Sequence, residues 1–597
     1  MRKQTKLVAV LSTAALLAIG ASMTSFAATG WAEEDGTWVY YNRDGERATD
    51  QWKKSGNNWY WLDSNGEMAI DQLIEDGDNY YYVDINGVMA ANQWVAIDNE
   101  DAGQDDEPDH YWYYFQANGK ALRNGDNNKV ALKTVNGKKY AFDDEGRMLF
   151  GWVASDNAER IDNTDGDAFK EGDYYFGGED DGAMTVGWLQ MDITYDDATS
   201  ESYKEIAPVF NDDEDQSRWF YFKSNGKKVM AEAGDYQKSK TINGKKYEFD
   251  ENGAMTAEWS LDVESASKSG YRGSYSNVTT NSVPAKYAQE WRYFQDVENG
   301  ARISKGWFKV VAAEYLNYEK NNDGEDAWYY ADGSGKLYAG EFKTIKGKKY
   351  AFRTDGRMID GLKFIKVVKG EIGESGVKAD DDDSHPFDTE DDFIDSANWY
   401  EQNGYACYYF GGGDDGAMRT NKNTIEIDGE KFNFFFEKSG SKKGAGKTGE
   451  DDDKVYQSGM LLKAGRDEKY QVVKKLDPTV DVNGDNEAID GYKKLDDVQA
   501  FIDEVGMSRT TPTDSQLKGL GISRKADDID EFYLVPSNTS ASANAGNTRA
   551  VAGNYFLINT SGKIINSNSK NKDGSDYYYV VQKAGKLGKI VAIYTEK

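Results

Sequence analysis

The sequence predicts an all-β protein: a solenoid of stacked β-hairpin repeats with acidic loop insertions and a small mixed module at the C-terminus. Three observations support this prediction. Bulky apolar residues recur every 21 positions near the N-terminus, at Trp31, Trp52, Leu73 and Trp94. A turn signal of Asn or Asp before Gly follows each aromatic cluster there, as at Asn65-Gly66. Aromatic residues make up 13% of the chain, which favours many small cores over a disordered acidic chain.

Each repeat within residues 30–94 is predicted to form one β-hairpin. Bulky positions alternate in Trp38-Val39-Tyr40-Tyr41, as is typical of a strand. Asn or Asp before Gly favours a tight turn, because such a turn needs a positive φ. A second short strand, carrying Met68 or Met89, is expected after the turn. One hairpin is marginally stable in water, so we expect neighbouring hairpins to stack and bury their aromatic faces.

Acidic insertions break the regular spacing after Trp94. The next aromatic cluster begins at Trp112, eleven residues later than the 21-residue interval predicts. We expect the insertions to be loops that extend into solvent, where added length is tolerated. Later acidic runs of the same kind occupy residues 156–173, 212–215, 321–326 and 380–392.

A longer period is superimposed on the short one. Residues 136–148, 243–255 and 346–358 are near copies, and their tyrosines are separated by 107 and 103 residues. A segment with two consecutive glycines, residues 174–184, returns at 408–418. These near copies indicate the duplication of a block of several hairpins.

The pattern changes from about residue 466. Apolar residues at helical spacing predict a helix over 495–505 that ends at Gly506, and a short helix over 514–520 capped by Thr513 or Asp514. Repeat-like hairpins are expected again near residues 554 and 577. We therefore predict a signal peptide (1–27), a repeat solenoid (28–465), a short helical segment (466–535) and C-terminal hairpins (536–597) that cap the solenoid.

Residues 1–27 have the composition of a secretory signal peptide. Basic residues precede an apolar run, and Ser25-Phe26-Ala27 supplies the small residues that a signal peptidase reads. No second apolar stretch is long enough to span a membrane, so we expect a secreted protein that is not membrane-spanning after signal removal. The formal net charge of −33 makes nucleic acid an unexpected partner. Cys407 is the single cysteine, which excludes an intramolecular disulfide.

The repeats resemble the choline-binding and glucan-binding repeats of bacterial cell-wall proteins. The resemblance rests on Gly30-Trp31 followed by the segment 38–45, and on the same frame in the third repeat. It covers roughly residues 30–460 and returns near 554–590. It implies a β-solenoid whose grooves hold the choline of teichoic acids, or sugar rings, against aromatic side chains. It also implies non-covalent attachment to the cell wall or cell surface.

The candidate ligand-binding residues are aromatic side chains at recurring positions of the hairpins. A cage of electron-rich rings attracts a quaternary ammonium group by about 0.5–2 kcal/mol per contact, and the same rings can stack on a sugar. Many weak grooves on one chain gain avidity for a polymer. Packing alone is the alternative role for any single ring. The candidates are Trp31, Trp38, Tyr40, Trp52, Trp59, Trp61, Tyr80, Tyr82, Trp94, Trp112, Tyr114, Trp152, Trp188, Trp219, Tyr221, Trp307, Trp328 and Tyr330.

Calcium is the one cofactor that the acidic loops suggest. Oxygen ligands close to a glycine are typical of calcium loops, although neither candidate loop has the full ligand spacing. Solvated acidic loops are the alternative interpretation. The candidate ligands are Asp162, Asp165 and Asp167 in one loop, and Asp481, Asn483 and Asp485 in the other.

No catalytic residue is expected. The two histidines, His110 and His385, lie in separate acidic loops, and Cys407 lies in an aromatic strand without a nearby histidine. We predict a non-catalytic surface protein that binds cell-wall choline, teichoic acid or glucan through multivalent aromatic grooves. One alternative is an adhesin or structural spacer whose acidic loops contact a partner protein. Another is an accessory subunit of a carbohydrate-active enzyme.

Overall fold

The computed structural model describes residues 29–104, 106–125, 128–194, 208–210, 215–270, 282–379, 384–465, 468–476, 491–536, 555–567 and 571–597. The expected signal peptide and the second candidate calcium loop, with Asp481, Asn483 and Asp485, lie outside these residues. The chain divides into two compact units. Unit 1 comprises Met1–Thr194 and Asp215–Val229, and unit 2 comprises Tyr195–Glu214 and Met230–Lys597.

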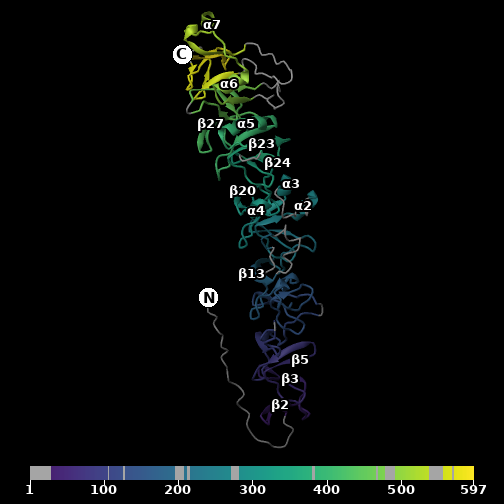
Figure 1. Ribbon diagram of the computed structural model, residues 1–597. Coiled ribbons are helices and arrows are strands. Elements are labelled where there is room, and N and C mark those ends of the chain that lie inside the picture. The colour runs from purple at the N-terminus through teal and green to yellow at the C-terminus, as the bar shows by residue number, and fades with distance from the viewer. Residues whose placement is uncertain are drawn as a thin grey trace. The chain divides into compact units, whose positions relative to one another are not determined.

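Unit 1 consists mainly of two-stranded antiparallel sheets that follow one another along the chain (Figure 1). One short 3-10 helix, η1 (Ala168–Lys170), lies in an acidic insertion. The strand pairs are β1 (Gly30–Glu34) with β2 (Thr37–Tyr41), β3 (Gln51–Ser55) with β4 (Asn58–Leu62), β5 (Gln72–Asp76) with β6 (Asn79–Val83), β7 (Gln93–Asp98) with β8 (His110–Phe115), β9 (Lys133–Val135) with β10 (Lys138–Tyr140), β11 (Trp152–Val153) with β12 (Tyr174–Tyr175), and β13 (Gly187–Thr194) with β14 (Asp215–Phe222).

The strands of each hairpin pair differently from the sequence prediction. The aromatic strand pairs with the strand before it, so Trp52 lies opposite Trp61 and the chain turns at the two residues 56–57. Gly56 has φ +59°, which a two-residue hairpin loop requires. The predicted turn that ends at Gly66 also forms, but the segment after it contributes isolated bridges and no strand: Met68 bridges to Leu62, and Glu67 bridges to Val39. The carboxylate of Asp63 closes this turn by accepting backbone N–H groups, and the chain then continues into the next hairpin.

Successive hairpins of unit 1 stack as predicted, joined by a recurring backbone hydrogen bond. In each case the residue after the turn donates its N–H to a carbonyl in the preceding hairpin. Alternate strand positions fill the core between them, where Tyr60, Tyr81 and Tyr113 are 5%, 9% and 5% exposed. The recurring bonds join Met68 to Trp38 (2.7 Å), Met89 to Trp59 (2.9 Å), Ala121 to Tyr80 (2.8 Å) and Met148 to Trp112 (2.7 Å).

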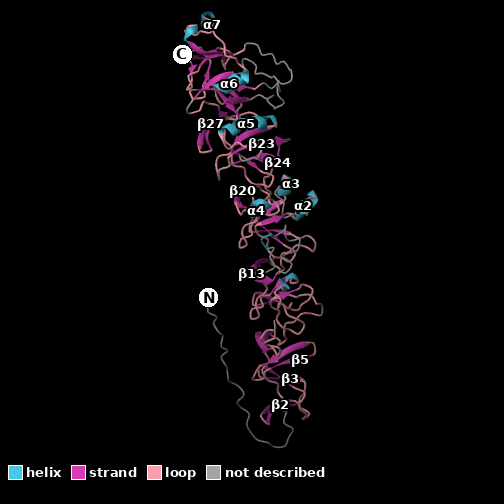
Figure 2. Cartoon of the chain, in the orientation of Figure 1, coloured by secondary structure: helices cyan, strands magenta, loops and turns pink. Residues whose placement is uncertain are grey.

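Unit 2 begins with hairpins of the same kind and continues into larger sheets (Figure 2). The hairpins are β15 (Lys238–Ile242) with β16 (Lys245–Phe249), β17 (Trp259–Leu261) with β18 (Trp291–Tyr293), β19 (Gly306–Val311) with β20 (Asp326–Ala331), and β21 (Glu341–Ile345) with β22 (Lys348–Phe352). A three-stranded sheet has the order β24 (Glu371–Lys378), β23 (Leu362–Val368), β25 (Tyr405–Tyr409). A five-stranded sheet has the order β26 (Asn421–Ile427), β27 (Glu430–Phe436), β30 (Met460–Leu461), β29 (Lys454–Gln457), β28 (Gly449–Asp451).

The C-terminal part of unit 2 contains two four-stranded sheets. The first has the order β32 (Tyr492–Leu495), β31 (Tyr470–Lys475), β34 (Tyr555–Asn559), β35 (Ile564–Ile565). The second has the order β33 (Ile529–Leu534), β38 (Lys589–Glu596), β37 (Tyr578–Gln582), β36 (Asn571–Lys572). The helical elements of unit 2 are η2 (Pro208–Phe210), α2 (Val263–Ser269), α3 (Ala285–Ala288), α4 (Tyr318–Asn322), α5 (Glu390–Gln402), α6 (Val498–Val505), α7 (Asp514–Gly519) and η3 (Ala526–Asp528).

The two helices predicted near the C-terminus are confirmed. Helix α6 ends at Gly506, which has a left-handed conformation, and α7 is capped by the side chain of Thr513. The expected boundary at residue 535, however, passes through both four-stranded sheets, because β31 pairs with β34 and β33 pairs with β38. The described parts of residues 468–597 therefore form one module. Its Phe556 also shares a core with Phe364 of the preceding sheet.

Two acidic runs that were expected to be loops contain helices instead. The run 321–326 overlaps α4, and the run 380–392 leads into α5. Thr389 caps α5, and the acidic residues of its first turn favour the positive end of the helix dipole. The buried residues Phe393, Ala397 and Tyr400 lie at the spacing of one helical face. Helix α5 is thus held by its apolar face while its acidic start stays at the surface.

In the part of the chain that the structure describes, no helix is both long enough and apolar enough to cross a membrane.

Candidate ligand-binding sites

A cross-strand aromatic pair is the repeated building block of the candidate sites. The bulky residue of the first strand lies directly opposite an aromatic residue of the second, and the rings meet mostly edge to face. The ring centroids are 5.3 Å apart for Trp31–Tyr40, 5.3 Å for Trp52–Trp61, 5.1 Å for Trp94–Tyr114, 5.3 Å for Trp152–Tyr175, 5.0 Å for Trp188–Tyr221 and 5.1 Å for Trp307–Tyr330.

The predicted ligand-binding residues differ in their exposure. Trp61, Trp152 and Tyr330 are 9%, 3% and 7% exposed, so these three serve the packing of the hairpins. Trp59 is 40% exposed and is the most accessible of the set. The remaining predicted residues are half-buried, which leaves part of each ring for a ligand: Trp31, Trp38, Tyr40, Trp52, Tyr80, Tyr82, Trp94, Trp112, Tyr114, Trp188, Trp219, Tyr221, Trp307 and Trp328.

Two aromatic clusters have the same geometry in the two units. The first cluster is Trp94, Trp112, Tyr114, Tyr140 and Phe142 in unit 1. The second cluster is Trp307, Trp328, Tyr330, Tyr350 and Phe352 in unit 2. Trp94 lies 4.9 Å from Tyr140 and 5.9 Å from Phe142, and Trp307 lies 4.8 Å from Tyr350 and 5.8 Å from Phe352. The longer sequence period thus corresponds to a duplicated arrangement of rings.

A carboxylate from a later hairpin lies beside the half-buried indole of Trp112 or Trp328 in each cluster. The indole N–H of Trp112 donates to Asp180 Oδ1 at 3.2 Å, and that of Trp328 donates to Asp414 Oδ1 at 2.9 Å. Hydrogen bonds from Trp328 and Lys309 lower the pKa of the Asp414 carboxyl. Sequence reasoning noted the recurrence of the double-glycine segments but missed these aspartates. Their shared Asp-Asp-Gly-Ala-Met sequence was the available signal.

Each of these aspartates also meets a second polar partner. In unit 1 the partner is His110, whose Nε2 lies 3.2 Å from Asp180 Oδ1. In unit 2 it is Lys309, whose Nζ lies 3.0 Å from Asp414 Oδ1. The two clusters therefore have the same rings and the same carboxylate but a different neighbouring base.

Lysines of the chain already approach aromatic faces in the early repeats. Lys53 Nζ lies 4.9 Å from the centre of the Tyr40 ring and donates to Asn42 at 2.7 Å. Lys54 Nζ lies 5.8 Å from the centre of the Trp59 ring. These contacts are cation–π interactions, which hold an ammonium group over a ring. A cationic ligand at Tyr40 would have to displace Lys53.

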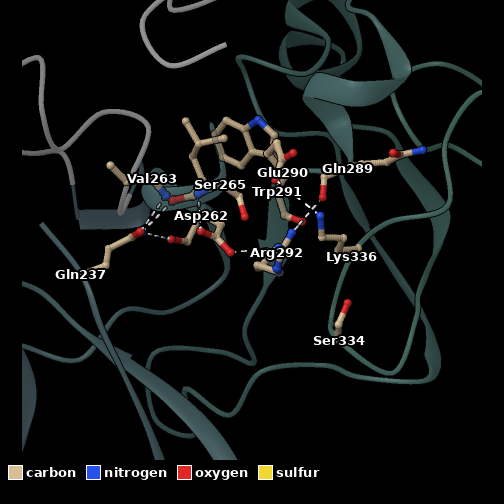
Figure 3. A network of polar contacts seen from close by, with 12 residues as sticks. Gln237, Asp262, Val263, Ser265, Gln289, Glu290, Trp291, Arg292, Ser334 and Lys336 are labelled. Atoms are coloured by element: carbon tan, nitrogen blue, oxygen red, sulfur yellow. Dashed lines mark hydrogen bonds and ion pairs between the residues drawn. The ribbon is translucent and has the colours of Figure 1, made fainter. Parts of the chain in front are cut away.

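A buried polar network in unit 2 supports the fold between two hairpins (Figure 3). Arg292 donates to the carboxylate of Asp262 at 2.9 Å, and Asp262 caps helix α2. The side chain of Gln237 accepts from the N–H of Val263 at 2.9 Å. The nearby Glu248 is half-buried, and the loss of solvation around its carboxyl raises the pKa of that group to about 7. This network fixes α2 and β18 to the preceding hairpin.

The first candidate calcium loop does not gather its carboxylates. Asp162 accepts the backbone N–H of Thr164 at 2.8 Å and its hydroxyl at 2.7 Å, which closes a local turn. Among the described residues, which include Asp165 and Asp167, no three or more His, Cys, Asp or Glu side chains lie together closely enough to hold a metal ion.

Cys407 and His385 have structural surroundings. Cys407 is 1% exposed, and burial raises the pKa of its thiol well above the usual value. A buried, protonated thiol is a poor nucleophile. The ring of His385 stacks on Trp399 with centroids 3.7 Å apart.

Comparison with known proteins identifies the repeats at the start of the chain. A model of the choline-binding repeat matches residues 28–72 and 51–94, which hold the first three 21-residue steps. Residues 28–94 are therefore choline-binding repeats. The repeats in this segment are of a binding-module type, and the strand content and hairpin pairs of the chain fit the predicted all-β class.

Similar proteins come from two streptococci. Glucosyltransferase-S of Streptococcus mutans is 23% identical over 250 residues, 42% of this chain and 11% of that protein. The modular autolysin LytC of Streptococcus pneumoniae is 17% identical over 57% of this chain and 55% of that chain, with a TM-score of 0.28. The choline binding domain of Spr1274 of Streptococcus pneumoniae is 33% identical over 16% of this chain and 96% of that chain, with a TM-score of 0.12. The chain thus spans about a tenth of the glucosyltransferase and about half of the autolysin.

Proposed function

We propose that this protein is a non-catalytic, secreted surface protein that attaches to choline-bearing cell-wall polymers through several aromatic sites. The observation that carries the proposal is the duplicated cluster: a half-buried indole, further aromatic rings and a carboxylate in each unit. Rings with a negative face and a nearby carboxylate both favour a cationic group over a neutral one. A quaternary ammonium group suits such a site because it cannot donate hydrogen bonds and is held by charge and ring contact alone.

Several weak sites on one chain make attachment to a polymer strong. A polymer with a choline on each repeating unit presents the second ligand at high effective concentration once the first is bound. The clusters of unit 1 and unit 2, together with the half-buried pairs such as Trp188–Tyr221, supply several such sites. Attachment would then need no covalent anchor.

Glucan is the second candidate ligand, because the chain is related to Glucosyltransferase-S over 250 residues. The aromatic rings could stack on sugar rings. A neutral sugar, however, carries no charge for the carboxylates beside Trp112 and Trp328 to attract. Binding of a partner protein by the acidic loops, and docking of an enzyme by residues 468–597, are the outcomes that remain if neither ligand binds.

Isothermal titration with choline chloride, and in parallel with isomaltotriose, tests the proposal on protein that starts at Ala28. We expect choline to bind and Trp112→Ala with Trp328→Ala to lower its affinity by about tenfold or more. Ile85→Ala, a change at an exposed side chain outside both clusters, is the control. Absence of choline heat would refute the proposal, and sugar heat abolished by the two tryptophan variants would favour glucan.

Attachment to cells provides a second readout. We expect the secreted protein to remain on choline-containing cell walls and to be released by a choline wash. Release by salt alone would instead indicate attachment through the acidic surface, because salt screens charge but leaves ring contacts intact.

A further inference from the structure

A polar pocket lies in unit 1 where two acidic insertions meet. Its volume is about 200 Å³, and its lining includes Glu107 and Glu159 from the insertions and Arg147 from the hairpin between them. It is separate from the rings of the first cluster, although Met148 lines the pocket and also packs in that cluster. The proposed choline sites do not use it.

The insertions around this pocket are fastened to each other. Arg160 Nη1 donates to the carbonyl of Asp106 at 2.6 Å, and its other terminal nitrogen pairs with the carboxylate of the same residue. The N–H of Asn163 donates to Asp106 Oδ2 at 2.8 Å. The sequence predicted free solvated loops here, but these bonds make the two insertions one wall. A fixed wall preserves the pocket between binding events, which lowers the cost of ordering on binding.

The polar groups of the pocket are oriented by contacts on their far sides. The guanidinium of Arg147 lies 4.8 Å from the centre of the Tyr111 ring, and that of Arg160 lies 4.4 Å from the centre of the Phe150 ring. Glu107 accepts the hydroxyl of Tyr111 at 2.9 Å. Arg147 also pairs with the carboxylates of Asp143 (3.5 Å) and Glu145, and Arg160 pairs with Asp106. A guanidinium has five N–H donors, so part of the donor capacity of each arginine is left for a ligand.

The mixture of groups selects a neutral, hydroxyl-rich ligand. Three carboxylates, from Glu107, Asp143 and Glu159, face two guanidinium groups, so neither an anion nor a cation meets a pocket of uniform opposite charge. Adjacent sugar hydroxyls donate to carboxylates and accept from guanidinium groups, and the apolar side of a pyranose ring suits Leu149 and Phe150. We propose that this pocket binds one pyranose unit of a neutral polysaccharide.

The insertion of unit 2 makes a direct contact at the equivalent corner. Arg357 occupies the position of Arg147 in the near-copy segments 136–148 and 346–358. The pair of Arg357 with Asp355 (2.7 Å) matches the pair of Arg147 with Glu145 and is common to both units. What differs is that Asn317, from the insertion of unit 2, donates to Asp355 at 2.9 Å, next to the fully buried Leu316. The insertion of unit 2 thus bonds directly to the segment that carries Arg357, whereas the insertions of unit 1 border a pocket beside Arg147. The two corners differ although the hairpins stack in the same way, so stacking alone does not account for the pocket in unit 1.

Saccharide titration followed by NMR tests the proposal on protein that starts at Ala28. The probes are isomaltotriose, for a glucan source, and the N-acetylglucosamine disaccharide, for a wall-glycan source. We expect saturable binding of one of them, weakened by about fivefold or more in Glu159→Gln and in Arg147→Lys, because each change removes charged hydrogen bonds to the sugar. Asp165→Asn, on the same insertion but outside the pocket lining, is the matched control.

Choline titration of the same variants separates this proposal from the choline sites. Unchanged choline affinity in Glu159→Gln shows that the variant is folded and that only the pocket is altered. Failure of both sugars to bind would overturn the proposal, whatever the choline result. Sugar binding that is lost in Trp112→Ala but retained in Glu159→Gln would also overturn it, because it would place the sugar on the aromatic cluster.

Discussion

The blocks 94–184 and 307–418 share an aromatic frame and differ at its edges. The ring distances within the two clusters agree to 0.1 Å, as for Trp94–Phe142 at 5.9 Å and Trp307–Phe352 at 5.8 Å. At the edges, the carboxylate meets His110, on the same strand as Trp112, in one block. In the other block it meets Lys309, on the strand opposite Trp328, and the insertions also make different contacts. Hairpin packing therefore constrains the positions of the rings. Residues of the insertions and at the edges of the clusters can differ between the blocks, and so alter which ligand binds.

The first prediction concerns the shared frame and has the largest expected effect. Trp94→Ala and Trp307→Ala should each lower the free energy of unfolding of their own unit by about 3 kcal/mol, because each removes a large, half-buried side chain from the same ring contacts. Urea denaturation followed by tryptophan and tyrosine fluorescence measures both losses. The two clusters would not be equivalent if one variant lost less than half as much free energy of unfolding as the other.

The second prediction concerns the middle near copy, residues 243–255, which departs from the frame. Glu248 stands where the flanking copies have the fully buried Ala141 and Ala351. Its pKa is raised from an ordinary value near 4.5 to about 7, mainly by burial and then by the charge of Asp262. The folded state therefore binds more protons than the unfolded state between these pH values. Stability from this group is present below pH 4.5 and is lost as the pH rises through 7.

Glu248→Gln should remove this pH dependence. We expect the wild-type protein to lose on the order of 2–3 kcal/mol of stability between pH 4.5 and pH 7 at this position, and the variant to lose none of it. Thermal unfolding at a series of pH values measures the difference. Ser265→Ala, a change at the start of α2, controls for general loosening of the region. Parallel pH profiles for the wild type and Glu248→Gln would contradict the assignment.

The third prediction uses the two carboxylates to separate the clusters. Asp180→Asn should lower choline affinity at the first cluster by about threefold to tenfold, because an exposed charge contributes modestly to attraction. Asp414→Asn should have a smaller effect, since the ammonium group of Lys309 already offsets that charge. Titration of each variant at low and at high salt measures both. Equal effects of the two substitutions would show that the neighbouring base is irrelevant.

The fourth prediction exchanges the bases and has the smallest expected effect. His110→Lys should make the first cluster behave as the second and lower its choline affinity by about twofold to threefold, because it adds a positive charge beside the ligand. Lys309→His should change the second cluster in the opposite direction near neutral pH. NMR titration with choline at pH 7.5 follows both. A change of the same sign in the two variants would contradict this account.

The sequence predicted the parts of the fold that depend on spacing along the chain. A 21-residue period requires each unit to meet its neighbour in the same way, so stacking and the aromatic positions followed from Trp31, Trp52 and Trp94. The predicted strand pairing within each hairpin was wrong, because each repeat contains two turn signals. The two strands pair across Gly56-Asn57, whereas the prediction placed the hairpin turn at Asn65-Gly66. The turn propensities of the residues do not by themselves decide which of the two turns joins the longer pair of strands.

The parts that depend on distant contacts were not predictable from the sequence. Trp112 and Asp180 are 68 residues apart, and a period of 21 does not indicate that hairpins further along the chain touch. Helix α5 begins in an acidic run, and such a run is typical of a solvated loop. Only the burial of Phe393 and Tyr400, which the structure shows, identifies the segment as a packed helix. The pocket beside Arg147 depends on how two insertions of unrelated sequence fold against each other.

The bond between each hairpin and the next has a mechanical consequence. Neighbouring hairpins are joined by the hydrogen bond from Met68 to Trp38 and its later equivalents, along with ring contacts. Under tension applied along the chain, such links are loaded one after another, so the repeats should yield singly and not as a block. A surface protein built in this way would lengthen in steps under fluid shear and dissipate the pull. It could then refold from any hairpin that remained intact.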